Sequence, residues 1–127
     1  MKQLLLIVSM LFFGILVRAD VGYVAKGVYA NAWIINTSAG NTLVDLVLPY
    51  SLWFDTIIVG GDVNGIASVE IVGVSKVKYY PFPAWVPVGD VFQDPIYVPA
   101  LTHILVKLFE GASGNYTVTI LGRLVTP

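Results

Sequence analysis

The chain has 127 residues, a length that suits one domain, and it contains no cysteine. Seven basic and eight acidic residues leave a net charge of −1 without a basic stripe, which excludes the usual nucleic-acid-binding surface. Charged residues make up 12% of the chain, against roughly 25% in an average soluble domain, while 57% of the residues are hydrophobic. A domain of this size cannot bury so much apolar surface, so the composition predicts a partner or an assembly.

Residues 1–19, MKQLLLIVSMLFFGILVRA, have the pattern of a secretory signal helix. A basic residue precedes a 14-residue apolar run, and Val17 and Ala19 occupy the −3 and −1 positions that a signal peptidase reads. Because a membrane-spanning helix needs about 20 apolar residues, a removed signal is favoured over a retained anchor, although Arg18 beside the cleavage point is unusual. We therefore expect one extracellular or cell-surface domain over residues 20–127, which contacts a membrane only if the N-terminal segment stays uncleaved.

The first segment of that domain, residues 20–36, alternates like a strand but is apolar on both faces. One interpretation is a central strand, or two strands bent at Gly27 or Asn31. The other is a terminal strand that completes the sheet of a neighbouring copy, as in β-strand addition. The donor is then residues 21–35. It makes contact through Val21, Tyr23, Val24, Val28, Tyr29, Trp33 and Ile35, in a groove lined by residues such as Val69, Ile71, Val106, Val118 and Ile120.

Alternation also predicts strands through the middle of the chain. TLVDLVL is a short strand, and FDTIIVGGDVNGIASVEIVG predicts a β-hairpin with strands near 54–60 and 66–72, joined by a turn around Asp62, Asn64 and Gly65. In the second of these strands the inward residues are expected to be Ala67, Val69 and Ile71.

The remaining segments continue the pattern. VSKVKYY predicts a strand with Val77 and Tyr79 inward and two lysines outward. THILVKLFE and YTVTILGRLV, separated by GASGN, predict a second hairpin with one polar face. Together these segments predict an all-β fold, an antiparallel β-sandwich or jelly roll of about 7–8 strands, preceded by the N-terminal hydrophobic signal helix.

The stretch YYPFPAWVPVGDVFQDPIYVP, residues 79–99, holds five of the seven prolines and many aromatic residues. Three interpretations are open: a loop that covers the end of the sandwich, a contact between copies, and a platform on which sugars stack. Proline suits an ordered loop and blocks the pairing of sheet edges, and aromatic residues are enriched in interface cores. The ring residues proposed for a ligand or an interface are Tyr80, Phe82 and Trp85.

Catalytic and metal-binding patterns are weak. Without cysteine there is no thiol nucleophile, and the single histidine, His103, falls on the polar face of its strand, so neither a catalytic triad nor a zinc site is expected. Asp62-x-Asn64-Gly65 fits a plain turn better than a calcium loop, and Asp90 and Asp94 are interpreted as solvated loop acids. We expect no cofactor and no enzymatic activity; a hydrolase with two carboxylates is the remaining catalytic alternative.

Two triplets, Asn36-Thr37-Ser38 and Asn115-Tyr116-Thr117, match the acceptor pattern for N-glycosylation. The sequence as a whole favours a secreted structural protein that assembles with itself into a filament, a pilus-like fibre, a surface coat or a virion surface. The alternative is a glycan-binding module or adhesin that uses the stretch 79–99.

Overall fold

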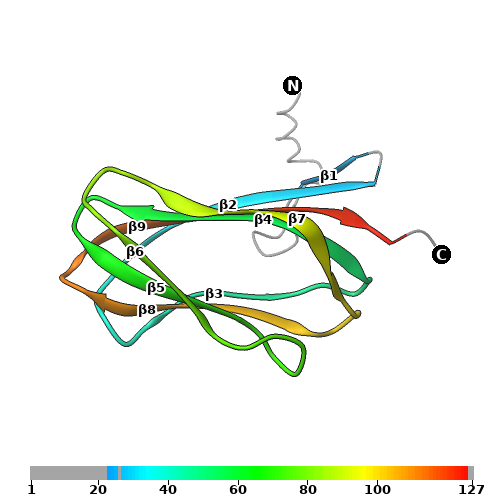
Figure 1. Ribbon diagram of the computed structural model, residues 1–127. Coiled ribbons are helices and arrows are strands. Elements are labelled where there is room, and N and C mark those ends of the chain that lie inside the picture. The colour runs from blue at the N-terminus through cyan, green and yellow to red at the C-terminus, as the bar shows by residue number, and fades with distance from the viewer. Residues whose placement is uncertain (1–22, 26, 126–127) are drawn as a thin grey trace.

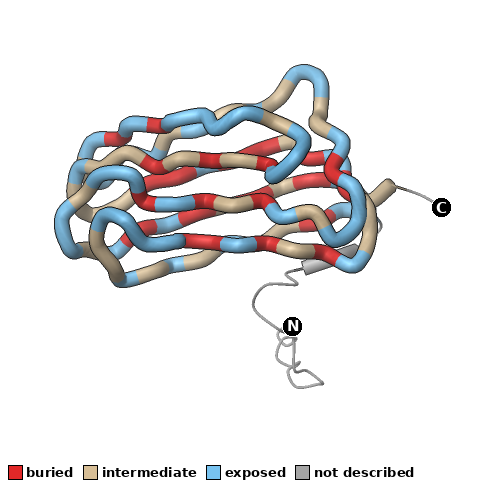
Figure 2. The backbone as a smooth tube through the Cα atoms, turned by 90° about the horizontal axis from the view of Figure 1, so that it is seen from below, coloured by how far each residue is buried: buried red, intermediate tan, exposed pale blue. Residues whose placement is uncertain are grey.

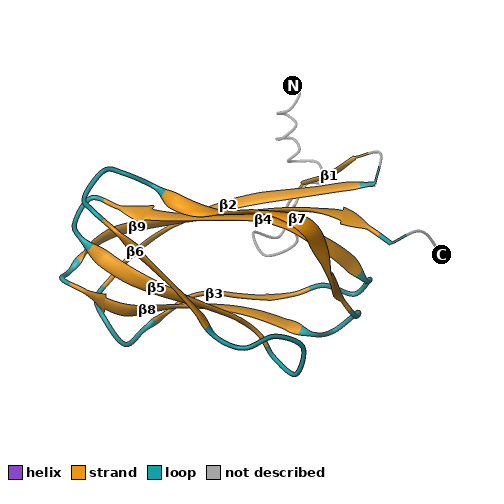
Figure 3. Ribbon diagram, in the orientation of Figure 1, coloured by secondary structure: helices purple, strands orange, loops and turns teal. Residues whose placement is uncertain are grey.

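The computed structural model describes residues 23–25 and 27–125, which form nine strands and, within those ranges, no helix (Figure 3). The predicted signal segment, residues 1–19, lies outside the described residues. The strands are β1 (Tyr23–Ala25), β2 (Val28–Thr37), β3 (Thr42–Val47), β4 (Leu52–Gly61), β5 (Gly65–Ile71), β6 (Lys78–Phe82), β7 (Val88–Val98), β8 (His103–Gly111) and β9 (Gly114–Leu124).

The strands form two antiparallel sheets that lie one above the other (Figure 1). The five-stranded sheet has the order β1-β2-β9-β4-β7, and the four-stranded sheet has the order β3-β8-β5-β6. Many of the pairings are nested, because β2 pairs with β9, β3 with β8, β4 with β7 and β5 with β6. The prediction of an all-β fold with two antiparallel sheets is therefore confirmed.

The core lies between the sheets and follows directly from the alternation of the sequence. Buried and exposed residues alternate along the strands (Figure 2). The largest side chains that are almost completely buried include Tyr29, Tyr116 and Phe54. Phe82 of the four-stranded sheet meets Tyr116 of the five-stranded sheet edge to face, with ring centroids 6.1 Å apart.

Both predicted hairpins are wrong in their pairing, although their strands and inward faces are correct. β4 and β5 lie in different sheets, and so do β8 and β9. In each case the short connection crosses from one sheet to the other. Alternation shows which side chains of a strand face the core. It does not show whether two consecutive strands pair within one sheet or lie opposite each other in two sheets.

The prediction for VSKVKYY is wrong in its phase. The strand β6 begins at Lys78 and buries Tyr80 and Phe82, while Tyr79 and Val77 are exposed. Tyr79 instead contacts Phe109 on the outer side of the four-stranded sheet, with ring centroids 5.0 Å apart. Because adjacent tyrosines fit either phase, the choice depends on Phe82, which continues the inward row beyond Pro81.

The aromatic-proline stretch is mostly strand rather than loop, since β6 and β7 together cover residues 78–82 and 88–98. β6 and β7 each lie at one edge of their sheet, and each contains a proline, Pro81 and Pro95. Proline in an edge strand lowers its capacity to pair with another chain. The true loop is the short segment 83–87, which carries Trp85.

The N-terminal segment contains two strands, not one. β1 and β2 are joined at Gly27, whose φ of +79° lies in the left-handed region. β2 then runs beside β9 over ten paired residues. This matches the interpretation of two strands bent at Gly27.

Candidate functional site

The outer side of the five-stranded sheet is unusually apolar. Residues facing each other across its strands form rows, one of which is Ala32–Thr119–Ile58–Gly89. Ile34 and Val91 on this side are 78% and 80% exposed. We call this surface the apolar face; it comprises Val28, Ala30, Ala32, Ile34, Ile58, Val91, Thr117, Thr119 and Leu121.

Charge is found at one end of the apolar face, where Arg123 and Asp55 form an ion pair at 3.1 Å. Next to them, Trp53 and Tyr97 make an edge-to-face contact at 5.4 Å. The centre of the apolar face consists of small and aliphatic residues and of threonines. This surface therefore has little to attract a charged partner.

The outer side of the four-stranded sheet has the opposite character. Its rows include Thr42–Lys107–Ser68–Tyr79 and Asp45–Leu105–Glu70. His103 lies beside Asp45, with Nδ1 and Oδ1 2.7 Å apart and both side chains exposed. The prediction that His103 lies on a polar face is confirmed.

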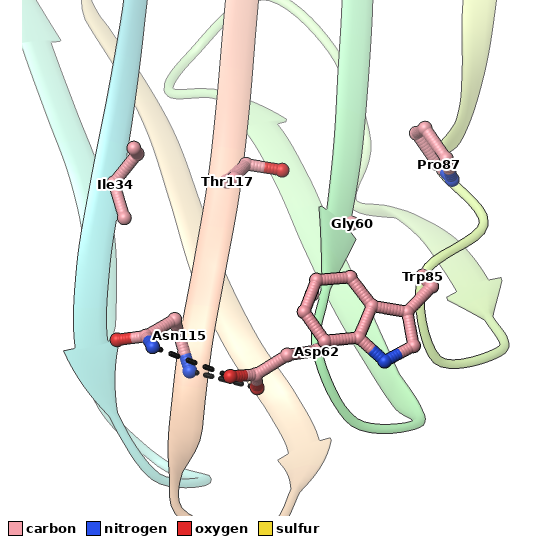
Figure 4. A pocket seen from close by; sticks show the side chains of 8 residues that line it. Ile34, Gly60, Asp62, Trp85, Pro87, Asn115 and Thr117 are labelled. Atoms are coloured by element: carbon pink, nitrogen blue, oxygen red, sulfur yellow. Dashed lines mark hydrogen bonds between the residues drawn. The ribbon is translucent and has the colours of Figure 1, made fainter.

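A pocket of about 320 Å³ opens at the other end of the apolar face (Figure 4). Ile34 of β2, Thr117 of β9 and Gly60 of β4 come from one row of the sheet, and the segment 83–87 closes one side. A Cβ atom at Gly60 would lie 3.2 Å from Pro87 Cα and 3.4 Å from Thr117 Oγ1, so the missing side chain keeps the pocket open. The lining consists of Ile34, Gly60, Gly61, Asp62, Trp85, Pro87, Asn115 and Thr117.

Trp85 is 79% exposed and has a φ of +66°. A large side chain rarely adopts the left-handed region, because its Cβ crowds the backbone there. The conformation is held by two main-chain hydrogen bonds: Trp85 N–H donates to Gly61 O at 2.8 Å, and Val86 N–H donates to Pro83 O at 3.2 Å. Ala84 N–H also donates to the Asn64 side chain at 2.8 Å. The indole is thus exposed on a fixed backbone.

The polar wall of the pocket is a chain of side-chain hydrogen bonds. Asp62 Oδ1 accepts from the backbone N–H of Asn115 at 2.9 Å, and Asp62 Oδ2 accepts from Asn115 Nδ2 at 3.2 Å. Asn115 Oδ1 accepts in turn from Asn36 Nδ2 at 2.9 Å. The two asparagines of the predicted glycosylation triplets are therefore direct cross-strand partners.

The aromatic residues proposed from the sequence have different surroundings. Tyr80 and Phe82 are 6% and 3% exposed and belong to the core, so Trp85 is the one of the three that presents its ring to solvent. Tyr80 also donates a hydrogen bond to Asp90 at 2.7 Å, and Lys78 donates to the same carboxylate at 2.6 Å. These bonds, Lys78 first, hold the pKa of Asp90 below its ordinary value, and burial together with Asp90 raises the pKa of Tyr80.

The proposed donor residues divide between the two faces of β2. Tyr29 is buried, and Trp33 and Ile35 pack against the core, whereas Val28 is exposed on the apolar face. Tyr23 and Val24 lie in β1, paired with Ala30 and Tyr29. Val21 lies outside the described residues.

Sequence reasoning did not identify Asp62, Asn115 and Thr117 as neighbours of Trp85. Asp62 follows β4, Asn115 and Thr117 lie in β9, and Trp85 lies between β6 and β7. The pairing of β9 with β4 and the return of the chain from β6 to β7 bring these three segments together. The one local signal in the sequence is the position of Trp85 between Pro83 and Pro87, because each proline ring fixes its own φ and so restricts the short segment. Within residues 23–25 and 27–125, no group of three or more His, Cys, Asp or Glu side chains is placed to hold a metal ion.

No known family model matches this chain, and a search of curated proteins finds no match either. In the part of the chain that the structure describes, no helix is long and apolar enough to span a membrane.

Proposed function

We propose that this protein is an exported structural subunit that associates with further copies of itself through the apolar face. The export part rests on the signal pattern of residues 1–19. The observation that carries the self-association is the contrast between the two outer sides: an aliphatic surface on the five-stranded sheet and a charged one on the four-stranded sheet.

We further propose that the two sheets form a jelly roll. The nested pairing supports this, because β2–β9, β3–β8, β4–β7 and β5–β6 describe a long hairpin rolled into two four-stranded sheets, with β1 added at one edge. Jelly rolls occur in viral capsid and lectin domains. That link is an analogy of fold and carries no function by itself.

A second copy is the partner that the apolar face fits best. A flat, uncharged sheet surface is complementary to itself, and a two-fold contact places the same patch on both sides. Between Val28 and Ile34 the face is about 20 Å long, and four strands with their side chains make it roughly 20–25 Å wide, so it covers about 400–500 Å² in projection. Stable interfaces bury about 800 Å² per partner. We therefore expect reversible association that depends on concentration, with further contacts needed to build a filament or coat.

Donor-strand exchange remains a second route to assembly. Beyond Asn31, β2 is paired only on its β9 side among the described residues, and unpaired strand edges can accept another strand. Exchange of the donor segment, residues 21–35, requires β2 to leave its own β9 and pair with that of a neighbour. Association through the apolar face leaves this pairing intact.

The test compares two lysine substitutions on opposite sides of the molecule. Ile58→Lys adds a charge to the centre of the apolar face, and Thr42→Lys adds one to the other sheet. Light scattering over a concentration series, with electron microscopy of the same samples, should give larger particles for the parent and for Thr42→Lys but monomers for Ile58→Lys. Equal particle masses for both variants would contradict the proposal.

A further inference from the structure

We propose that the pocket beside Trp85 binds a pyranose ring of a neutral glycan, with one face of the sugar stacked on the indole. The C–H bonds on one face of a pyranose carry a slight positive charge, which suits the negative face of an aromatic ring. Trp85 offers that face to solvent, since it is 79% exposed.

The backbone that carries the indole is already held in place. Hydrogen bonds from Ala84, Trp85 and Val86 fix the segment between Pro83 and Pro87. A rigid platform loses little conformational freedom on binding, so more of the contact energy appears as affinity. An exposed tryptophan in the left-handed region has no packing role that would explain it, whereas strained residues cluster at functional sites.

The opposite wall supplies polar groups that match sugar hydroxyls. Asp62 accepts hydrogen bonds, the Asn115 side chain both donates and accepts, and the Thr117 hydroxyl does either. Figure 4 shows Asp62 and Asn115 joined beside the indole, with Thr117 further along the strand. Each Asp62 oxygen accepts one amide hydrogen and keeps lone pairs for hydroxyl donors.

The electrostatics favour a neutral ligand over a cation. Asp62 is the one carboxylate in the lining, and amide donors already hold both of its oxygens. At about 320 Å³, the pocket is at the small end of ligand sites, which run from about 300 to 1,000 Å³. This size suits one ring of a glycan chain, and a single ring in an open pocket implies a Kd on the order of 1 mM.

The sugar has two possible sources: a foreign glycan, or a glycan carried by this chain. Asn115 and Thr117 belong to an acceptor triplet and also line the pocket, and Asn36 is the cross-strand partner of Asn115. A glycan on either asparagine would start next to Trp85. In both cases a pyranose ring stacks on the Trp85 indole.

The experiment follows the three indole N–H signals, from Trp33, Trp53 and Trp85, by NMR on the purified protein made without N-glycosylation. The probes are neutral oligosaccharides of glucose, galactose, mannose and N-acetylglucosamine. At least one should shift the Trp85 signal and leave Trp33 unchanged. The backbone amide signal of Asn115, which lines the pocket, measures binding by the variants that lack an indole. Trp85→Ala should weaken binding at least tenfold, whereas Trp53→Ala, at the far end of the apolar face, should leave it unchanged.

Three results would overturn the proposal: no shift of Trp85 with any probe up to about 50 mM, unchanged binding by Trp85→Ala, or a shift caused by butylammonium but by no sugar. Unshifted Trp33 and Trp53 signals in the Trp85→Ala protein confirm that it is folded. Repeating the titration on protein from a glycosylating host separates the sources. A Trp85 signal that is shifted before any sugar is added identifies the chain's own glycan, and an unshifted one identifies a foreign glycan.

Ile34 and Thr117 belong both to the apolar face and to the pocket lining, so sugar binding is also tested on a protein that does not self-associate. Ile58 does not line the pocket, so the Ile58→Lys protein should bind the same sugars as the parent. If that protein is monomeric and binds no sugar while the parent binds, the pocket forms only between copies, and the proposal of a site within one chain fails.

Discussion

Replacing Val91 with alanine should weaken association measurably without weakening the fold. Val91 is 80% exposed at the end of the row Ala30–Leu121–Thr56–Val91. The substitution removes two carbon atoms, each worth about 0.8 kcal/mol when buried, and scaling by the exposed fraction gives about 1.3 kcal/mol per copy. In a two-fold contact both copies lose this amount, so the dimer should be weaker by about 2.6 kcal/mol, or roughly 80-fold in Kd.

Sedimentation velocity over a concentration series measures the dimer constant. The matched control is Val77→Ala, the same substitution at a residue that is 42% exposed in the segment between β5 and β6, away from the apolar face. Melting temperatures of both variants should stay close to that of the parent, because neither side chain is in the core. A dimer constant that changes equally in both variants, or in neither, would refute the assignment of the apolar face as the contact.

Three further predictions concern the fold. Asp90→Asn should lower stability above about pH 4. The pKa of Asp90 in the folded protein lies below its ordinary value of 3.8. The ionised carboxylate therefore stabilises the fold above pH 3.8, and this effect is lost as the pH falls through the folded pKa. Thermal melting from about pH 2 to 7 should give a flatter curve than the parent, and parallel curves would contradict this. The Tyr50 hydroxyl is buried without a hydrogen-bond partner among the described residues. Urea unfolding of Tyr50→Phe should therefore show a stability equal to that of the parent or higher by up to about 1 kcal/mol. A clear loss of stability would show that the hydroxyl is hydrogen-bonded. Ile57→Ala should lower the free energy of unfolding by about 2–5 kcal/mol, since this side chain is fully buried. Ile58→Ala should lower it by about 1 kcal/mol or less. Equal losses would show that the two faces of β4 are wrongly assigned.

The inward faces of most strands could be predicted from the sequence because burial in a sheet has a period of two residues. Ala67, Val69 and Ile71 are buried as predicted. The predicted phase of burial was wrong at Tyr79 and Tyr80, because either of two adjacent aromatic residues can face the core.

Strand partners could not be predicted, because pairing depends on contacts between distant segments. β4 and β5 are joined by three residues and still lie in different sheets. The same limit applies to the pocket: the aromatic-proline stretch points to Tyr80, Phe82 and Trp85 alike, and no local pattern links Asp62 and Asn115 to Trp85. Their proximity follows from the register of β9 with β4, which no local pattern contains.

The absence of cysteine from the chain allows the most direct test of the apolar face. Thr119 lies at its centre, in the row Ala32–Thr119–Ile58–Gly89, and Ser68 lies in a central row on the other sheet. Mild oxidation of the single-cysteine variants Thr119→Cys and Ser68→Cys measures which side meets its copy, because a disulfide requires Cα atoms within about 7 Å. We predict fast formation of a linked dimer by Thr119→Cys and little by Ser68→Cys. Equal rates, or faster linkage through Ser68→Cys, would contradict association through the apolar face.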